Sequence, residues 1–436
     1  FQHFMLFETL TVVQNVALAL PGRPDLQDLA QRIDAVGRRY GLPVDPGRLV
    51  HTLSVGERQR VEIIRCLLQN PKLLIMDEPT SVLTPQAVRK LFETLRQLSD
   101  EGCSVLYISH KLDEVRELCH AATVLRSGRV TGHCVPARET PASMARMMIG
   151  RELVSCQRGA PRAAGELRLA LRGLTQPAQH AFGIALANVN LEVRAGEIVG
   201  IAGVSGNGQQ ELLQALSGEL PLKCAPDAVQ VDGQPAGHLG SGARRARGLA
   251  FVPEERLGRG AVPAMTLAEN GLLTGYRQGL VRRGLVRRGA LRAFAQRCIA
   301  EFGVKCDGPD APASALSGGN LQKFIVGREV MQRPRLLVVA QPTWGVDVGA
   351  AASIRQSLVA LRDAGTAVLV VSEELEELFE VCDRIAVISE GRLSPTVPIQ
   401  HTSVETIGLW MSGMWPEAAG AAVPRLDEEK EVRHVA

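Results

Sequence analysis

The feature that most constrains this chain is a repeat of its own sequence at a fixed spacing. Three pairs of segments are each separated by 263 residues, since 316 − 53, 336 − 73 and 372 − 109 all equal 263: Leu53-Ser54-Val55-Gly56-Glu57 with Leu316-Ser317-Gly318-Gly319-Asn320, Leu73 to Thr80 with Leu336 to Thr343, and Ser109-His110 with Ser372-Glu373. Three matches at one spacing indicate a tandem duplication.

Each copy predicts the same order of elements. A helix follows each Leu-Ser-x-Gly motif, and its buried face is marked by apolar residues at helical spacing: Val61, Ile64, Leu67 and Leu68 in the first copy, and Leu321, Phe324 and Ile325 in the second. A short apolar strand, a helix and another strand follow, the last over 104–108 and 367–371. Strands that alternate with helices predict an α/β fold, with a mainly parallel sheet covered on both faces.

The second copy also contains a glycine-rich loop between a predicted strand, 196–202, and a predicted helix, 211–216. Backbone N–H groups in such a loop, with the helix N-terminus behind them, can hold phosphates. Its candidate binding residues are Gly203, Ser205, Gly206, Asn207, Gly208, Gln209 and Gln210. The first copy should have its own loop, but the chain opens at Phe1 with a segment that matches the region near Phe251 in the second copy. That region lies 251 − 166 = 85 residues into the second copy. We therefore expect about that many residues to be missing before Phe1, in a fragment or through a misassigned start.

Candidate catalytic residues of the first copy follow its predicted strands. Asp77 suits Mg²⁺ and Glu78 suits general-base work on water, because carboxylates at the carboxyl edge of a parallel sheet face the ligand crevice. His110 could donate to a γ-phosphate, and Gln2 could contact Mg²⁺ and water. The alternatives are that Asp77 and Glu78 are surface acids in a turn, that His110 is structural, and that Gln2 belongs to an ordinary polar terminus.

The Leu-Ser-x-Gly motifs supply a further set of candidates. Small residues at a helix start let its positive end approach a phosphate. The candidates are Ser54 and Gly56 in the first copy, and Ser317, Gly318, Gly319 and Asn320 in the second. Simple N-capping by the serines is the alternative, and both can hold together.

Composition narrows the function classes. The net charge of the 436 residues is only +3 and aromatics are 4%, which argue against nucleic-acid binding. No apolar run approaches the roughly 18–20 residues that span a bilayer, so work at a membrane would need a partner. The nine cysteines, which lack metal-ligand spacing, are expected to be reduced, mostly buried thiols of a cytosolic protein.

Together these motifs resemble the ATPases of ABC transporters, with Walker A, signature, Walker B, D-loop and switch histidine. The tandem arrangement is similar to simple-sugar importers, and more so to the nucleoside importers that work with basic-membrane-lipoprotein binding proteins. The segments that carry this are Gln2 to Met5, Leu53 to Glu62, Ser81 to Gln86, Phe251 to Arg256 and Met265 to Asn270.

The resemblance implies two P-loop NTPase cassettes, each with a helical subdomain, that bind ATP and Mg²⁺ head to tail. It also implies permease subunits as partners, an extracytoplasmic binding protein as an indirect one, and a peripheral place on the cytoplasmic face of the membrane. The second copy departs from the family pattern at its own nucleotide site, where hydrolysis is expected to be lost. The departing residues are Gln209, Gln210, Ala340, Gln341 and Glu373.

These observations predict a first cassette over 1–150 without its Walker A part, a linker over 151–165, a second cassette over 166–416 and a charged tail over 417–436. Two other functions stay open: a soluble tandem-cassette protein of the translation or regulatory type, and an inactive remnant.

Overall fold

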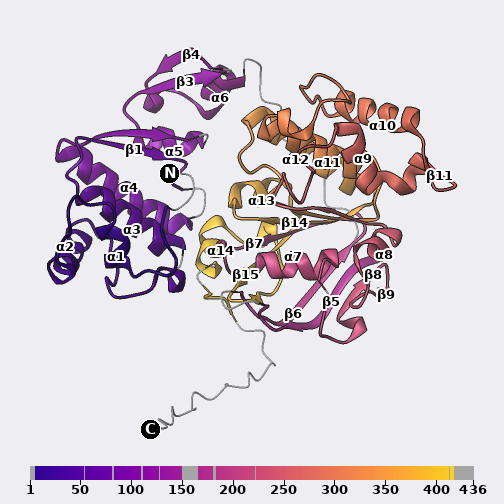
Figure 1. Cartoon of the computed structure of the whole chain (residues 1–436), viewed down its shortest axis with the longest axis horizontal. Coiled ribbons are helices and arrows are strands. Elements are labelled where there is room, and N and C mark those ends of the chain that lie inside the picture. Colours follow the sequence, from indigo (N-terminus) through magenta and orange to yellow (C-terminus); the bar gives the residue numbers. More distant parts are fainter. Residues whose placement is uncertain are drawn as a thin grey trace, which may run out of the picture.

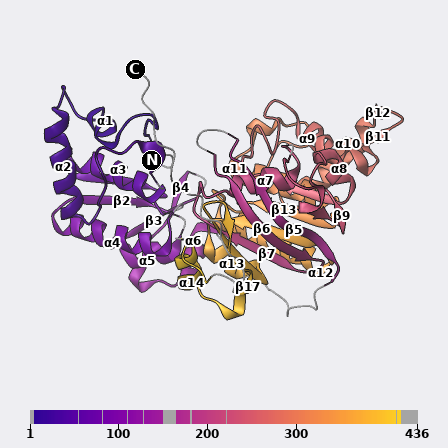
Figure 2. The same ribbon diagram turned by 90° about the horizontal axis from the view of Figure 1, so that it is seen from below.

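The computed structural model describes residues 5–53, 55–80, 83–109, 111–126, 128–149, 165–179, 183–220, 222–411 and 413–416. Two bodies lie side by side in both ribbon views, the first drawn from indigo to purple and the second from magenta to yellow (Figures 1 and 2). They correspond to the two copies of the repeat. The predicted linker, apart from Gly165, and the predicted tail lie outside the described residues.

The first cassette consists of helices around two small pairs of strands. Its helices are α1 (Val12–Ala17), α2 (Leu26–Arg39), α3 (Val55–Leu67), α4 (Pro85–Asp100), α5 (Leu112–Leu118) and α6 (Pro141–Ile149), with short 3-10 turns at Val50–Thr52 and Pro136–Arg138. Its strands are β1 (Leu73–Asp77) and β2 (Ser104–Ile108), which are parallel, and β3 (Ala122–Arg126) and β4 (Arg129–Cys134), which are antiparallel.

The second cassette is larger. Its strands are β5 (Leu167–Gln176), β6 (Leu186–Arg194), β7 (Ile198–Ala202), β8 (Val229–Val231), β9 (Gln234–Pro235), β10 (Leu249–Val252), β11 (Val281–Arg282), β12 (Leu285–Val286), β13 (Leu336–Ala340), β14 (Ala367–Ser372), β15 (Arg384–Ser389), β16 (Arg392–Leu393) and β17 (Val397–Pro398). Its helices are α7 (Gln209–Ser217), α8 (Ser241–Ala246), α9 (Leu267–Gly275), α10 (Arg288–Glu301), α11 (Gly318–Val330), α12 (Val348–Asp363), α13 (Leu375–Val381) and α14 (Val404–Trp410). A π-helical turn lies at Tyr276–Leu280, and 3-10 turns at Pro226–Ala228, Ala313–Ala315 and Ile399–His401.

A seven-stranded sheet forms the centre of the second cassette, in the order β10-β13-β14-β7-β15-β16 with β17 also paired to β15. The five strands β10, β13, β14, β7 and β15 run parallel. Alternate residues face two cores: Leu337 and Val339 pack among the helices, whereas Leu336 and Val338 pack toward α7 and the antiparallel sheet β6-β5-β8-β9. The parallel sheet covered on both faces, expected from the sequence, is therefore present here.

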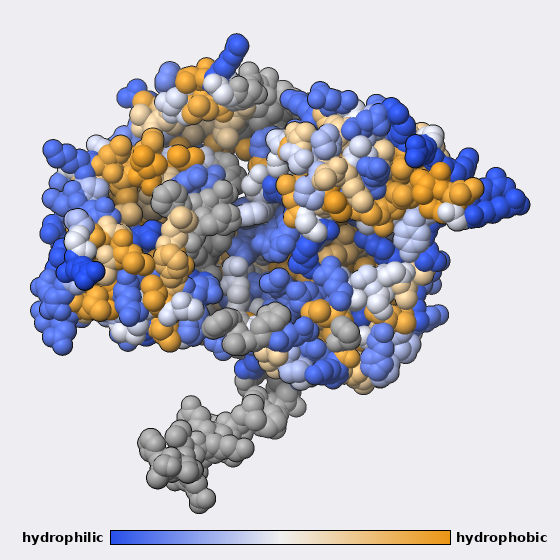
Figure 3. All heavy atoms as spheres, viewed as in Figure 1, coloured by the Kyte–Doolittle hydropathy of each residue, from blue (hydrophilic) through white to orange (hydrophobic). Residues whose placement is uncertain are grey.

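The first cassette differs from that expectation on one face of its sheet. Leu74 and Met76 are buried in its core, but Leu73 and Ile75 are 53% and 57% exposed. Within the described residues β2 pairs only with β1, so β1 and β2 leave one side open. Hydrophobic residues are visible on the surface over this cassette (Figure 3). The apolar runs are thus strands in both copies, and they differ in what covers them.

The duplication is also visible in local detail. Thr11 and Gln14 form a capping box at the start of α1, as Thr266 and Glu269 do at the start of α9. Reciprocal packing relates the cassettes, since α6 contacts α12 while its equivalent α14 contacts α4. Such exchange of equivalent elements is the mark of a pseudo-twofold arrangement.

Among the helices that the structure describes, none is long and apolar enough to cross a membrane. The eight cysteines in the described ranges are free thiols. Only two of these eight, Cys298 and Cys382, are buried, so the expectation that most of them are buried was wrong.

Candidate functional site

The acidic pair of the first cassette lies at the carboxyl end of β1. Asp77 is paired in register with Ile108 of β2, and the N–H of Glu78 donates to the Ile108 carbonyl at 2.9 Å. The chain leaves β2 beside this pair, two residues before position 110. Asp77 and Glu78 are both half-buried. Two carboxylates therefore project from the edge of the sheet where a ligand of a parallel sheet is bound.

Glu78 has a strained backbone. Its φ is 46°, in the left-handed region, and the equivalent Gln341 has a φ of 44°. The Gln341 N–H donates to Val371 at 2.8 Å, which repeats the bond made by Glu78. A long side chain in this conformation costs on the order of 1–3 kcal/mol and is typical of functional sites. Both cassettes keep this geometry, although only the first keeps the carboxylate.

A glutamate, half-buried in the first cassette and fully buried in the second, holds the segment after positions 77–78 and 340–341 by hydrogen bonds. The Glu114 carboxylate accepts hydrogen bonds from Thr80 Oγ1 and the Tyr107 hydroxyl, each at 2.7 Å. Glu377 accepts from Thr343 Oγ1 at 2.7 Å and from Ser372 Oγ at 2.8 Å. Our sequence analysis missed both glutamates, although their separation, 377 − 114 = 263, would have revealed them.

The glycine-rich loop lies between β7 and α7, as predicted. Gly206 and Gly208 have φ of 81° and 105°, which favour glycine. A Cβ on Gly203 would lie 2.6 Å from Gln209 Nε2 and 2.8 Å from the Ile388 carbonyl oxygen, so this position requires glycine as well. Five of the candidate residues line one pocket: Ser205, Gly206, Gly208, Gln209 and Gln210. The backbone thus has the form of a phosphate-binding loop.

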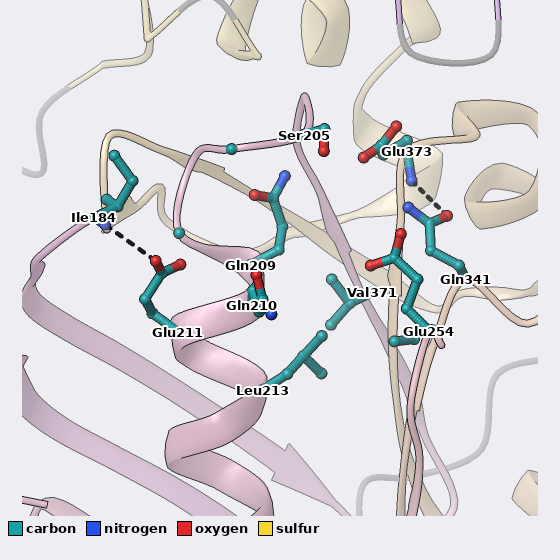
Figure 4. A pocket seen from close by; sticks show the side chains of 13 residues that line it. Ile184, Ser205, Gln209, Gln210, Glu211, Leu213, Glu254, Gln341, Val371 and Glu373 are labelled. Carbon is teal, nitrogen blue, oxygen red and sulfur yellow. Dashed lines mark hydrogen bonds between the residues drawn. The ribbon is translucent and has the colours of Figure 1, made fainter. Parts of the chain in front are cut away.

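Gln209 fills part of that loop with its own side chain (Figure 4). Its Oε1 accepts from the Asn207 N–H at 3.0 Å, and its Nε2 donates to the Val204 carbonyl at 2.8 Å. The carboxamide oxygen therefore holds a loop N–H of the kind that could bind a phosphate oxygen. Among the described residues that line the pocket, none is Lys or Arg.

Glu373 stands where the repeat has His110 in the first cassette. Its N–H donates to Gln341 Oε1 at 3.2 Å, and its side chain lines the same pocket as Glu254. The pKa of Glu373 is raised to about 8, chiefly by burial and also by the nearby Glu254 carboxylate, whereas a hydrogen bond with Ser205 opposes the shift. With no Lys or Arg in the described lining and a glutamate at the histidine position, the site offers no cationic side chain to the phosphates of a nucleotide, which is unfavourable for hydrolysis.

The signature helices begin close to the positions predicted. Ser317 precedes α11 as its N-cap residue, but its side chain makes no capping hydrogen bond and its Oγ accepts from Asn320 Nδ2 at 2.9 Å. Ser317 and Gly318 are exposed, so the start of α11 is open to a ligand. In both copies a glutamine in this helix donates to the proline after the acidic position: Gln59 to Pro79, and Gln322 to Pro342 at 3.1 Å.

The structure thus places the loop residues together and Asp77 beside Glu78. Gly56 lies in the first turn of α3, with a Cβ position 3.9 Å from Leu83. Three predicted site residues, Gln2, Ser54 and His110, lie outside the described residues. The described residues hold no group of three or more His, Cys, Asp or Glu that could by itself bind a metal ion.

Comparison with known proteins decides the family. The family described as ABC transporter matches residues 1–81 and 186–344, which together cover more than half of the chain. The chain is an ABC transporter family ATPase.

Curated relatives match this ABC protein over most of its length, and the match spans 81–83% of their own. The glucose import ATP-binding protein TsgD13 of Haloferax volcanii is 38% identical over 94% of this chain and 81% of its own. The guanosine import ATP-binding protein NupO of Bacillus subtilis is 38% identical over 97% and 83%. The nucleoside import ATP-binding protein NupA of Lactococcus lactis is 36% identical over 94% and 82%.

Solved structures support the tandem fold. A complex of the archaeal ribosomal stalk protein aP1 with the archaeal ribosome recycling factor aABCE1 matches 92% of this chain and 73% of that chain, with a TM-score of 0.63 and 19% identity. This similarity supports a fold of two tandem ABC cassettes.

Proposed function

We propose that this chain is the ATP-hydrolysing subunit of an ABC importer for nucleosides or simple sugars. The observation that carries the proposal is the acidic pair at the end of β1, with Glu78 held in a left-handed backbone beside the end of β2. The named functions of the relatives supply the direction and class of transport. Of the two substrate classes, nucleosides are our first choice for the transported molecule and simple sugars our second.

The first cassette supplies the catalytic groups. Asp77 provides the carboxylate oxygen that Mg²⁺ prefers, and Mg²⁺ is commonly held by one or two carboxylates together with substrate phosphates. When bound, the ion neutralises charge on the phosphates. Glu78 accepts a proton from the attacking water, His110 holds the γ-phosphate and water, and Gln2 contacts the metal region.

The signature of one cassette serves the nucleotide of the other. In this assignment Ser317, Gly318 and Gly319, with Asn320 behind them, complete the site of Asp77 and Glu78. Ser54 and Gly56 complete the site of the glycine-rich loop in the second cassette. That second site does not hydrolyse ATP, since Gln209 closes its loop and Glu373 replaces a histidine.

The partners follow from the same assignment. Permease subunits provide the membrane path, and an extracytoplasmic binding protein delivers the substrate. The chain is placed peripherally at the cytoplasmic face, where ATP is available.

Transport by the complete importer in vesicles tests the proposal. Glu78→Gln should lower ATP hydrolysis and uptake by about 10²–10⁴-fold while ATP still binds, because it removes only the base. Gln341→Ala is the matched control in the second cassette and should cost much less. Equal losses from the two changes would show that the active site is wrongly assigned. Co-purification with ribosomes and never with membranes would overturn the importer role.

A further inference from the structure

Arg256 joins three segments of the second cassette. It lies in the loop after β10, and its carbonyl accepts from the Ala261 N–H at 2.7 Å. Its Nε donates to Gln322 Oε1 on α11 at 3.1 Å. Its Cζ lies 5.7 Å from the ring centroid of Trp344, in the segment after β13. One guanidinium therefore connects the loop after β10, the signature helix α11 and the segment that follows Gln341.

Two glycines leave the space that this guanidinium fills. A Cβ on Gly318 would lie 2.5 Å from Arg256 Nη1, and a Cβ on Gly345 would lie 3.6 Å from Nη2. Arg256 thus lies across the first residue of α11. Any side chain at position 318 would displace it.

The repeat has different residues at three positions around this guanidinium. At a spacing of 263 residues, Gly318, Trp344 and Gly345 correspond to Val55, Ser81 and Val82. By contrast, Gln322, Pro342 and Thr343 keep the same residue in the first copy, as Gln59, Pro79 and Thr80. Three residues beside the guanidinium therefore differ between the copies, whereas Gln322, which accepts from it, is kept.

Stability alone does not account for Arg256. Burial lowers the pKa of its guanidinium, so the charged form is held in a partly desolvated place. Its Nη2 atom is buried and has no hydrogen-bond partner among the described residues. An unsatisfied buried donor costs about 1–3 kcal/mol, and more for a charged group. A residue kept at such a cost is typical of a functional site.

We propose that Arg256 is a positioning residue for ATP hydrolysis. It holds Ser317-Gly318-Gly319 in a fixed place relative to Trp344-Gly345, so that the start of α11 meets the nucleotide of the first cassette in the right position. This inference rests on the proposed function, in which the second signature completes the competent site. In the same assignment the signature of the first cassette serves the non-hydrolysing site, and Val55, Ser81 and Val82 stand there in place of Gly318, Trp344 and Gly345.

Steady-state ATP hydrolysis by the complete importer tests this role. Arg256→Met keeps the length of the side chain but removes the fork and charge, and should lower kcat by about tenfold or more, since small misplacements near reacting groups are costly. KM for ATP should change by less than about threefold, because residues of the first cassette bind the nucleotide. Arg256→Lys keeps the charge without the planar fork and should recover only part of the loss.

Arg259 provides the matched control on the same loop, where it pairs with Glu219. Arg259→Met should leave kcat unchanged. Trp344→Phe keeps a ring under the guanidinium and should stay close to the parent, whereas Trp344→Ala should lose activity. The double variant Arg256→Met/Trp344→Ala should be no worse than Arg256→Met alone, because both changes disturb one contact.

Several results would overturn the inference: kcat of Arg256→Met within about twofold of the parent, full recovery by Arg256→Lys, or additive losses in the double variant. If Arg256→Met does not fold, the comparison of Trp344→Phe with Trp344→Ala decides alone, and equal activities would refute the role. Failure of the proposed function is seen separately, as a parent protein whose hydrolysis does not respond to Glu78→Gln.

Discussion

Replacing Glu377 by glutamine should make the second cassette more stable in alkaline solution. Glu377 is fully buried, and its pKa is raised from 4.5 to about 7, chiefly by burial, while hydrogen bonds from Thr343 and Ser372 and the positive charge of Arg355 partly oppose the shift. The neighbouring Glu374 adds to the increase. The folded protein therefore binds a proton more tightly than the unfolded chain does.

The sign and size of the effect follow from linkage. Because the folded pKa is raised, the contribution of Glu377 is fully present below about pH 4.5 and is lost as the pH rises through about 7. The difference between a pKa of about 7 in the folded protein and 4.5 in the unfolded chain lowers the free energy of unfolding at high pH by about 3 kcal/mol at most. Glutamine does not titrate, but its single carboxamide oxygen can replace only one of the two carboxylate oxygens that accept from the Thr343 and Ser372 hydroxyls. The weakened hydrogen bond costs about 1 kcal/mol. We expect a net gain of about 1–2 kcal/mol at pH 8 and no gain at pH 5.

Urea unfolding followed by tryptophan fluorescence measures this directly. All three tryptophans, Trp344, Trp410 and Trp415, belong to the second cassette, so the signal reports that cassette. Glu301→Gln, a change at the exposed end of α10, is the control and should leave the pH dependence as in the parent. The reasoning is refuted if Glu377→Gln and the parent lose the same stability between pH 5 and pH 8.

Three further predictions concern the sites. Ser317→Arg should nearly abolish ATP hydrolysis by the complete importer. Ser54→Arg should leave more activity, because the proposed head-to-tail pairing assigns Ser54 to the degenerate site. A larger loss from Ser54→Arg would refute that pairing. Gln209→Lys should strengthen nucleotide binding by about 10- to 100-fold, the value of one charged hydrogen bond, and equilibrium dialysis that finds no added binding would contradict this. Thr80→Val removes the 2.7 Å bond to Glu114 and should cost about 1–2 kcal/mol in urea unfolding followed by circular dichroism, so unchanged stability would count against that anchor.

Spacing within the sequence predicted the elements well because a duplicated chain tests each prediction twice. The strands at 73–77 and 336–340, the helices after both signatures and the loop before α7 were all found as predicted. Burial agreed for Val61 and Ile64, whereas Leu67 and Leu68 are only half-buried, at and just after the end of α3. Apolar periodicity reports which residues can be buried and does not report what covers them.

The side-chain arrangement of the site could not be predicted in the same way. The sequence shows that Gln209 replaces a lysine of the family pattern, but the hydrogen bonds of its carboxamide to Asn207 and Val204 depend on the loop backbone. Likewise, Arg256 is far from Gln322 and Trp344 in the sequence, and only folding brings them together. Contacts of this kind carry no local periodicity.

The open side of β1 and β2 determines how the purified chain will behave in solution. Leu73, Ile75, Leu106 and Ile108 are each between 45% and 57% exposed, beside a strand edge that no other described strand covers. Unpaired edges next to apolar surface are templates for intermolecular strand addition. Aggregation should therefore begin at the first cassette, and Ile75→Lys should raise the concentration at which turbidity appears. The five parallel strands at the centre of the second cassette are almost entirely buried, so that sheet gives no comparable route.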